Sequence, residues 1–408
     1  MNKKVLIVEP SFYGVSFVKS AKKMGCKVIC VVSSLANPKK YGYNGYYDDL
    51  ILADIRSSSS ILKAIGESEY DNFDAIIPAT DYAIAVTAKV AQKLKMYGNS
   101  YFAAKCARNK DLARKQFLKE NVPSANFAVV KTLKEAQEAS QLIGYPLILK
   151  PTNTASSIDV FYIQNNEELK RKFNQITKLK KSYMDFKVRN EYILEEYLDG
   201  PEFSVELFLN NDSIEFAEVT EKHTTEPPYF VELMHIFPTT IEIQHKKEII
   251  ETAYQAARSL DFHSGPTHIE VKLTSSGPKI VEVNGRPGGD HITSDLIYDS
   301  YGINIFQKTI DLYLNNQVSI TPSYNGAAAI NFLFSNNSGK FNSIQGINYI
   351  KSSPYFKKLE IDAIPGQVIS KPTNSDDRIG YYILSGKNGE QLKNEISELN
   401  KKIKIIID

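Results

Sequence analysis

The chain has 408 residues, of which 42% are hydrophobic and 24% charged, and its formal net charge is only +2. This composition is typical of a folded globular protein, and the length exceeds one ordinary core, so two or three domains are expected. The small net charge provides no global field that would attract nucleic acid or a membrane surface.

The N-terminal segment and the cysteines favour a cytoplasmic protein. The first apolar run is interrupted by Glu9 and Pro10, so it is too short for the core of a signal peptide and predicts a strand. No run approaches the ~20 apolar residues that a membrane span needs. The odd set of Cys26, Cys30 and Cys106 lacks metal-ligand spacing, and reduced core thiols fit a reducing compartment.

Residues 1–100 are expected to form an open α/β domain with a parallel sheet. Short apolar runs at 4–10, 27–32 and 74–80 alternate with helical patterns, which is typical of strands joined by crossover helices. The turn after the first run contains only Gly14 and lacks a glycine fingerprint. This absence argues against a nicotinamide-dependent dehydrogenase.

Residues 101–190 are expected to form linker helices and a smaller α+β unit. A strand predicted at 145–151 contains Lys150, whose position before a polar loop suits contact with a bound anion. A lysine that extends its ammonium into water at a sheet edge is the equally simple alternative. Lys110 opens a predicted helix, where an anion is also favoured, although a surface lysine is the ordinary interpretation.

Residues 191–408 are expected to form a larger α+β lobe and a C-terminal α+β subdomain, and their most informative part is a predicted hairpin. Its first strand alternates, so that Glu270 lies on one face, and a turn at 275–278 leads to a second strand that carries Glu282 and Asn284. Two carboxylates and an amide on one sheet face suit Mg²⁺, which takes oxygen ligands. The alternative is a solvated hairpin face, but the β-branched neighbours and the NGRPGG segment that follows favour a site.

The order of these features resembles the ATP-grasp superfamily of carboxylate–amine ligases. The resemblance rests on Lys110, then Lys150 with its proline, then EEYLDGPEFSVE, then HIEVK and IVEVNGRPGG, over about residues 100–310. It implies an N-terminal open parallel-sheet domain followed by two α+β lobes that hold ATP between them. It also implies transfer of the ATP γ-phosphoryl group to a carboxylate, attack of an amine on the acyl phosphate, and release of ADP and phosphate.

The resemblance also assigns ligands to positions of this sequence. It implies ATP and two Mg²⁺ ions as cofactors, with Mn²⁺ as a substitute, and a homodimer. Nucleotide contacts are expected from Lys110, Lys150, Ser156, Ser157, Glu195, Glu196, Tyr197, Leu198 and Glu202. Metal ligands are expected from Glu270, Glu282 and Asn284.

Within the superfamily, PPYFVELMHIFP is similar to the bacterial L-amino-acid ligases, which make dipeptides. This similarity implies catalytic roles for Glu232 and His235, and the superfamily resemblance implies that Arg286 stabilises the acyl phosphate. Gly289 is expected at the substrate, and Asp376 faces either solvent or the guanidinium of a substrate arginine at the N-terminal position. A core histidine beside a strand carboxylate is the alternative for the Glu-x-x-His pair.

One departure from the pattern concerns the loop 152–159, which contains no glycine, whereas the phosphate-covering loop of ATP-grasp enzymes is usually rich in it. Two other functions remain open at this point. A ligase for a non-amino-acid carboxylate would use the same machinery. A catalytically silent nucleotide-binding protein would have no need for the full carboxylate and arginine set.

Overall fold

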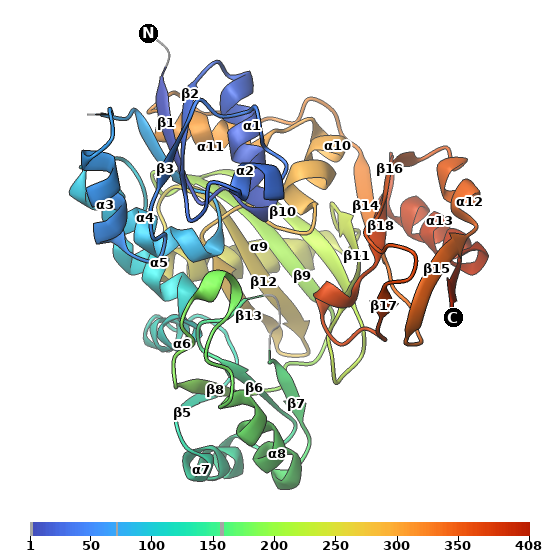
Figure 1. Ribbon diagram of the computed structural model, residues 1–408. Coiled ribbons are helices and arrows are strands. Elements are labelled where there is room, and N and C mark those ends of the chain that lie inside the picture. Colours follow the sequence, from blue (N-terminus) through green and yellow to red (C-terminus); the bar gives the residue numbers. More distant parts are fainter. Residues whose placement is uncertain (1–2, 71, 156–158) are drawn as a thin grey trace.

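The computed structural model describes residues 3–70, 72–155 and 159–408, and Figure 1 shows its arrangement. The N-terminal domain contains a parallel sheet in the order β3-β2-β1-β4. Its strands are β1 (Lys4–Val8), β2 (Lys27–Val32), β3 (Asp49–Leu52) and β4 (Ala75–Pro78). Its helices are η1 (Phe12–Gly14), α1 (Val15–Lys23), α2 (Asn37–Lys40), α3 (Ser58–Gly66) and α4 (Asp81–Lys93).

Both faces of this sheet are covered. Val5 and Ile7 belong to the core on one face, whereas Leu6 and Val8 belong to the core on the other. The continuous apolar run of β1 is explained by this double burial, because a parallel sheet between helices leaves neither side to water. The expected parallel α/β domain is confirmed, and the structure adds β3, which the apolar pattern did not predict.

A small antiparallel sheet in the order β5-β8-β6-β7 forms the lobe at the bottom of Figure 1. It consists of β5 (Phe127–Val130), β6 (Leu147–Pro151), β7 (Phe161–Ile163) and β8 (Tyr192–Glu196), with α7 (Leu133–Ile143), α8 (Asn166–Ile176) and η2 (Tyr183–Asp185). Because β8 lies between β5 and β6, the lobe extends past the boundary expected at residue 190.

The linker helices α5 (Tyr101–Arg108) and α6 (Lys110–Lys119) pack on the large lobe rather than on the small sheet. Cys106 and Phe117 are buried in the same core as Leu207 and Ile269 of the large sheet. The start of α6 is thereby fixed beside the hairpin predicted from the sequence.

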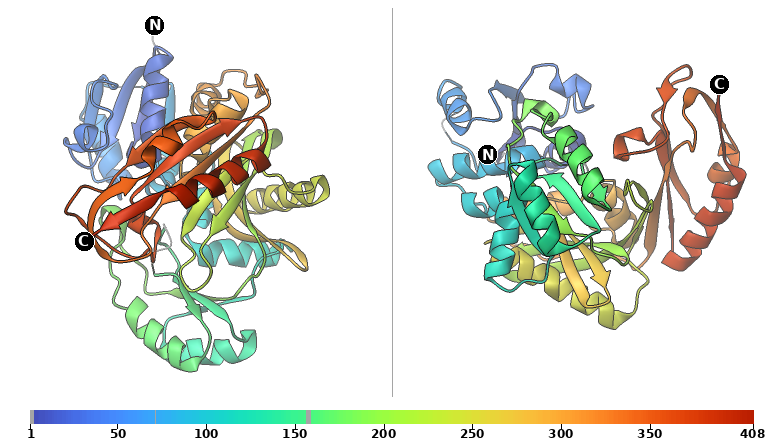
Figure 2. Two further views of the ribbon diagram at one scale, coloured as in Figure 1. Left: turned by 90° about the vertical axis from the view of Figure 1, so that its right-hand side faces the viewer. Right: turned by 90° about the horizontal axis from the view of Figure 1, so that it is seen from below.

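The large lobe and the C-terminal part share an eight-stranded sheet in the order β13-β12-β9-β10-β11-β14-β18-β16. These strands are β9 (Glu202–Asn210), β10 (Ser213–Thr224), β11 (Glu232–Phe237), β12 (Gly265–Thr274), β13 (Gly277–Asn284), β14 (Ala327–Leu333), β16 (Phe356–Ile361) and β18 (Gly380–Gly386). The helices α9 (Ile243–Ser259), η3 (Ile292–Leu296), α10 (Ile297–Tyr301) and α11 (Ile305–Tyr313) complete the lobe. The C-terminal part stands to one side of the small lobe in Figure 2.

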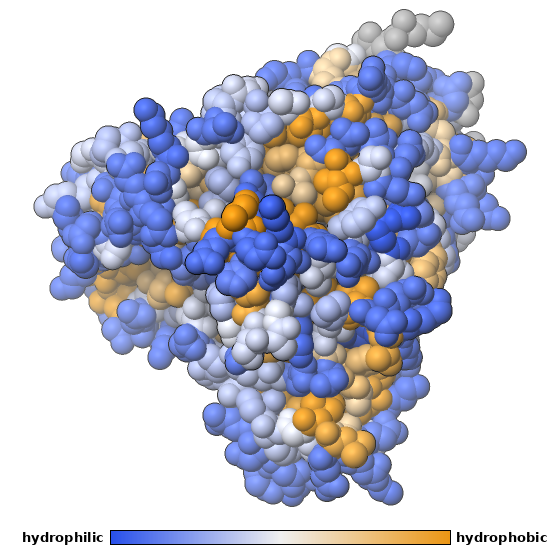
Figure 3. All heavy atoms as spheres, turned by 180° about the vertical axis from the view of Figure 1, so that it is seen from behind, coloured by the Kyte–Doolittle hydropathy of each residue, from blue (hydrophilic) through white to orange (hydrophobic). Residues whose placement is uncertain are grey.

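The C-terminal part adds a three-stranded sheet in the order β17-β15-β19. Its remaining elements are β15 (Gly339–Gln345), α12 (Ile347–Lys351), β17 (Val368–Ile369), η4 (Ser375–Asp377), α13 (Gly389–Lys402) and β19 (Lys404–Ile407). Seen from behind, the surface is largely hydrophilic with apolar patches between charged residues (Figure 3). Among the described residues, no helix is both long and apolar enough to cross a membrane.

Candidate active site

A cleft lies between the small sheet and the large sheet. The register of β12 and β13 places Glu270 directly opposite Glu282, and both side chains line the cleft. The charged residues of its wall are Lys110, Arg114, Lys150, Glu195, Glu196, Glu202, Lys222, Glu232, Glu270, Lys272 and Glu282. Most of the residues predicted from the sequence meet in this cleft.

The two predicted phosphate ligands reach the cleft from different elements. Lys110, at the start of α6, places its Nζ 2.8 Å from the Thr154 carbonyl oxygen and 3.3 Å from Glu282 Oε1. Lys150 is the last residue but one of β6, and its buried Nζ lies 2.6 Å from Glu195 Oε2. Both ammonium groups therefore lie next to carboxylates at the wall of the cleft.

Glu195 is fully enclosed and is bound on two sides. Besides Lys150, it accepts a hydrogen bond of 2.7 Å from Nε of Arg114. Burial works to raise the pKa of Glu195, but Arg114 and Lys150 outweigh it, so the pKa is lowered. The pKa of Lys150 is lowered because burial outweighs the attraction of Glu195. The sequence suggested an adenine contact for Glu195, and the structure places its carboxylate between these two cations.

Glu196, Tyr197 and Leu198 follow along the same strand end and line the cleft. Lys279 and Asn126 each contact the carboxylate of Glu196 at 2.7 Å. Tyr197 stacks with Phe230 at a ring-centroid distance of 6.0 Å. The aromatic wall that Tyr197 and Phe230 form in the cleft suits a flat heterocycle. Ser156 and Ser157, which were predicted to contact phosphates, lie outside the described residues.

Glu270 has two cationic neighbours, of which strand alternation in the sequence identifies His268 but not Lys222. Nζ of Lys222 lies 3.0 Å from Glu270 and 2.8 Å from Glu202, and Nε2 of His268 lies 3.7 Å from Glu270. Burial alone would lower the pKa of Lys222, but Glu202 and Glu270 outweigh it and raise the pKa. The available signal was the alternation of β10, in which Lys222 shares a face with the buried Thr220.

The predicted metal ligands are only partly assembled at the cleft. Asn284 is buried opposite His268 in the hairpin register and does not line the cleft. Within residues 3–70, 72–155 and 159–408, no group of three or more His, Cys, Asp and Glu side chains has the spacing of a metal site. The two carboxylates that do line the cleft are oxygen donors, which suit a hard divalent cation shared with phosphate oxygens.

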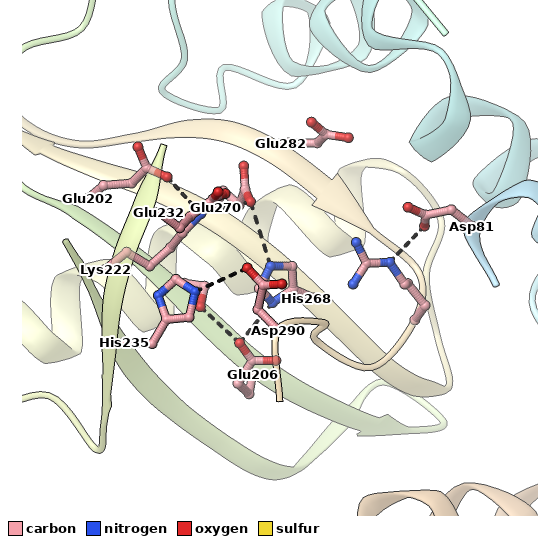
Figure 4. A network of polar contacts seen from close by, with 12 residues as sticks. Asp81, Glu202, Glu206, Lys222, Glu232, His235, His268, Glu270, Glu282 and Asp290 are labelled. Carbon is pink, nitrogen blue, oxygen red and sulfur yellow. Dashed lines mark hydrogen bonds and ion pairs between the residues drawn. The ribbon is translucent and has the colours of Figure 1, made fainter. Parts of the chain in front are cut away.

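The Glu-x-x-His pair lies on β11, next to a loop of the C-terminal part. Glu232 lines the cleft and accepts a hydrogen bond from the Ser375 hydroxyl. The buried His235 places Nε2 3.5 Å from Asp290 Oδ2 (Figure 4). Arg378 donates to both oxygens of that aspartate at 2.8 and 2.9 Å. His235 is thus both a core histidine and a member of a polar network that ends at the cleft.

The remaining predicted site residues border this network. Asp376 is exposed in η4 and accepts a hydrogen bond from the Tyr183 hydroxyl, so the small lobe and the C-terminal part meet here. Arg286 does not line the cleft; its Nε donates 2.8 Å to Asp81 Oδ1 of the N-terminal domain. Gly289 is half-buried, and a Cβ atom there would lie 3.9 Å from Nη1 of Arg286.

Comparison with known proteins identifies the fold and two regions of the chain. Residues 143–295 match the family described as ATP-grasp domain, and residues 331–408 match L-amino acid ligase C-terminal domain 2. The structure superposes on the crystal structure of an L-amino acid ligase from Bacillus licheniformis with a TM-score of 0.83, at 21% identity, over 100% of this chain and 99% of the other. A phosphoribosylglycinamide synthetase from Anaerococcus prevotii gives a TM-score of 0.74 at 21% identity, with full coverage of both chains.

Two sequence relatives are ligases from Bacillus subtilis. The alanine–anticapsin ligase of strain 168 is 31% identical over 253 residues, which are 59% of this chain and 53% of the relative. An L-arginine-specific L-amino acid ligase is 24% identical over 289 residues, which are 68% of this chain and 67% of the relative. The chain therefore spans about half the length of the alanine–anticapsin ligase that it matches.

The chain therefore contains an ATP-grasp domain at residues 143–295, and its residues 331–408 match a C-terminal domain of the L-amino acid ligases. The resemblance seen in the sequence and the expected two-lobed fold are thereby confirmed. The roles of individual site residues remain predictions.

Proposed function

We propose that the protein joins two L-amino acids into a dipeptide with hydrolysis of ATP to ADP and phosphate. The observation that carries this proposal is the meeting of Lys110 and Lys150 with the facing pair Glu270 and Glu282 in one cleft. Two cations and two carboxylates brought together from separate elements suit a triphosphate with its divalent ions.

The residues present fit ATP and Mg²⁺. Lys110 and Lys150 would bind phosphate oxygens, and the wall formed by Glu196–Leu198 and Phe230 would hold the adenine. Glu270 and Glu282 would supply metal ligands, with Asn284 behind them. Bound Mg²⁺ would neutralise the charge that spreads over the phosphoryl oxygens during transfer.

The chemistry begins at the carboxylate of the first amino acid. One of its oxygens attacks the γ-phosphorus, the bond to the β-phosphate oxygen breaks, and ADP leaves. The resulting acyl phosphate is attacked at its carbonyl carbon by the uncharged amine of the second amino acid. The C–N bond forms, phosphate leaves with the electrons of the C–O bond, and the amine nitrogen loses a proton to a base.

The chain has side chains that could assist each step of this reaction. Arg286 would stabilise the charge on the acyl phosphate, because a planar guanidinium matches two oxygens. Glu232 would bind the α-ammonium of an amino acid, and His235 would orient a substrate or assist loss of the amine proton. Closure of the small lobe would exclude water, which otherwise hydrolyses the intermediate.

We also propose that the first amino acid is basic, such as arginine. Asp376 is an exposed carboxylate on the loop whose Ser375 contacts Glu232, so a guanidinium side chain has an acidic partner there. The L-arginine-specific relative from Bacillus subtilis supports this choice. D376A should lower selectivity for arginine over leucine by at least about tenfold, the value of one good charged contact. Unchanged selectivity would rule out this role.

A panel of amino-acid pairs tests the main proposal. Purified protein is incubated with ATP, Mg²⁺ and each pair, ADP is measured, and products are identified by mass spectrometry. ADP formed in step with a dipeptide is the expected result. AMP with pyrophosphate would contradict the mechanism, and an amide built on a non-amino-acid carboxylate would favour the chemistry of other ATP-grasp ligases.

Two properties of the whole protein also stay proposals. We expect a homodimer, which light scattering after size-exclusion chromatography would show as twice the chain mass. We expect a cytoplasmic protein, because Cys26, Cys30 and Cys106 are buried free thiols.

A further inference from the structure

The guanidinium of Arg286 is held by the N-terminal domain, far from it in sequence. Asp81 lies three residues after the end of β4, opens α4, and accepts the 2.8 Å hydrogen bond from Nε. The side chains are 14% and 10% exposed, so this ion pair is enclosed. Figure 4 shows Asp81 approaching from the N-terminal domain, apart from the carboxylates of the large sheet.

Tyr13 is a second residue that contacts this guanidinium. The Tyr13 ring centroid lies 5.0 Å from Cζ of Arg286, and the Tyr13 hydroxyl oxygen accepts a 2.9 Å hydrogen bond from the Asp81 backbone N–H. The loops that carry these residues touch closely, since a Cβ at Gly14 would lie 2.5 Å from the Ala79 carbonyl oxygen. The contact between the Tyr13 loop and the Asp81 loop is therefore rigid, because neither loop can move without the other.

The contacts with Asp81 and Tyr13 leave part of the guanidinium available to bind an anion. Nη1 donates to the Pro287 carbonyl oxygen at 2.8 Å, and no described residue accepts a hydrogen bond from Nη2. Burial works to raise the pKa of Asp81, but Arg286 and Arg108 outweigh it and lower the pKa, so the carboxylate stays ionised. A charged, oriented partner that takes only Nε can fix the plane of an arginine while its far edge serves another anion.

We propose that Asp81 is a positioning residue that orients Arg286 toward the acyl phosphate, so that the N-terminal domain completes the active site. This inference rests on the proposed function, in which Arg286 acts on the reacting group. An interdomain ion pair that only stabilises the fold is the competing explanation. The two differ in whether the effect of Asp81 passes through Arg286.

The test is a double-mutant cycle with D81N, R286M and the double variant. Each is assayed for ADP release and for binding of a fluorescent ATP analogue. Misplacement of a group in the transition state costs about 100-fold, so D81N should lower kcat by about that factor and leave KM for ATP within about twofold. D81N added to R286M should change kcat by less than about twofold, because the group that it orients is already gone.

D48N is the matched control. Asp48 lies in the same domain and accepts hydrogen bonds from Lys22 Nζ at 2.6 Å and from the Val28 N–H at 2.7 Å. It should keep the kcat of the unaltered protein even where its thermal midpoint falls. Thermal unfolding of all variants separates loss of fold from loss of turnover.

The outcomes separate this inference from the proposed function. Dipeptide formation by the unaltered protein with additive losses in the cycle would overturn the inference and keep the function. ADP release without dipeptide, but with non-additive losses, would keep the inference and overturn the function. Absence of ADP release with every substrate would overturn both.

Discussion

Removal of the Glu195 carboxylate should destabilise the large and small lobes together. This group lies 2.7 Å from Arg114 Nε and 2.6 Å from Lys150 Nζ, and all three side chains are at least nine-tenths buried. E195Q keeps the shape but leaves two enclosed cations without their anion. K150M removes one cation and leaves the Arg114–Glu195 pair intact, which makes it the matched comparison.

The expected magnitudes differ between these two variants. Breaking a buried ion pair from one side costs about 3–5 kcal/mol, because the remaining charge has lost water and partner alike. At roughly 2–4 °C per kcal/mol for units of 150–250 residues, E195Q should lower the unfolding midpoint by about 10 °C. K150M should cost about 1 kcal/mol, since a neutral chain of similar length replaces the lysine.

Thermal unfolding followed by circular dichroism measures both variants, and pH provides an internal check. The pKa of Glu195 is lowered in the folded protein, because the attraction of Arg114 and Lys150 outweighs burial. Its stabilisation is therefore present above the ordinary glutamate pKa of about 4.3 and is lost as pH falls through the lower folded value. The difference between E195Q and the unaltered protein should shrink toward acid pH.

Nucleotide binding should distinguish the two variants in the opposite order, because K150M should lose more ATP affinity although E195Q loses more stability. K150M should weaken ATP binding by at least about tenfold while its fold persists, because the proposed function gives Lys150 a charged contact with phosphate. An E195Q midpoint within about 2 °C of the unaltered protein at pH 7 would refute the reasoning, because a cost of about 3–5 kcal/mol should lower the midpoint by about 10 °C. Equal destabilisation by the two variants would refute it as well.

Three further predictions concern the neighbouring hairpin. Burial works to lower the pKa of His268, but Glu206 outweighs it and raises the pKa to about 9. The protein should therefore lose about 3 kcal/mol of stability as the pH rises from about 6.5 to 9. Urea titrations of H268N should not show that loss. E282Q should raise the Mg²⁺ concentration needed for half-maximal ADP release by about tenfold, whereas Lys110 still binds nucleotide. G288A should lower the unfolding midpoint, because its Cβ would lie 2.6 Å from Glu206 Oε2, and an unchanged melting curve would contradict that contact.

The hairpin shows how far sequence reasoning reaches. Strand alternation and the turn at 275–278 were enough to predict that Glu270 faces Glu282, and the register confirms it. Such a prediction succeeds because a two-residue period and a tight turn are local properties. The parallel N-terminal sheet was predicted for the same reason, from short apolar runs separated by helical patterns.

The residues that contact the site residues could not be predicted from the sequence. Lys222 meets Glu270 across two neighbouring strand pairings, and Asp81 meets Arg286 from another domain. These contacts depend on the sheet order and on domain placement, neither of which leaves a periodic trace in the chain. The small-lobe boundary was misplaced because β8 returns to the middle of its sheet after a long excursion.

The shared sheet makes the C-terminal part inseparable from the rest of the molecule. β11 pairs with β14 from Met234↔Asn331 to Phe237↔Ala328. A chain shortened before β14 would leave the backbone N–H and C=O groups of β11 as an open edge, which invites pairing with other molecules. Truncation at this junction should therefore yield aggregates, and a dissection of the protein into soluble pieces has to cut elsewhere.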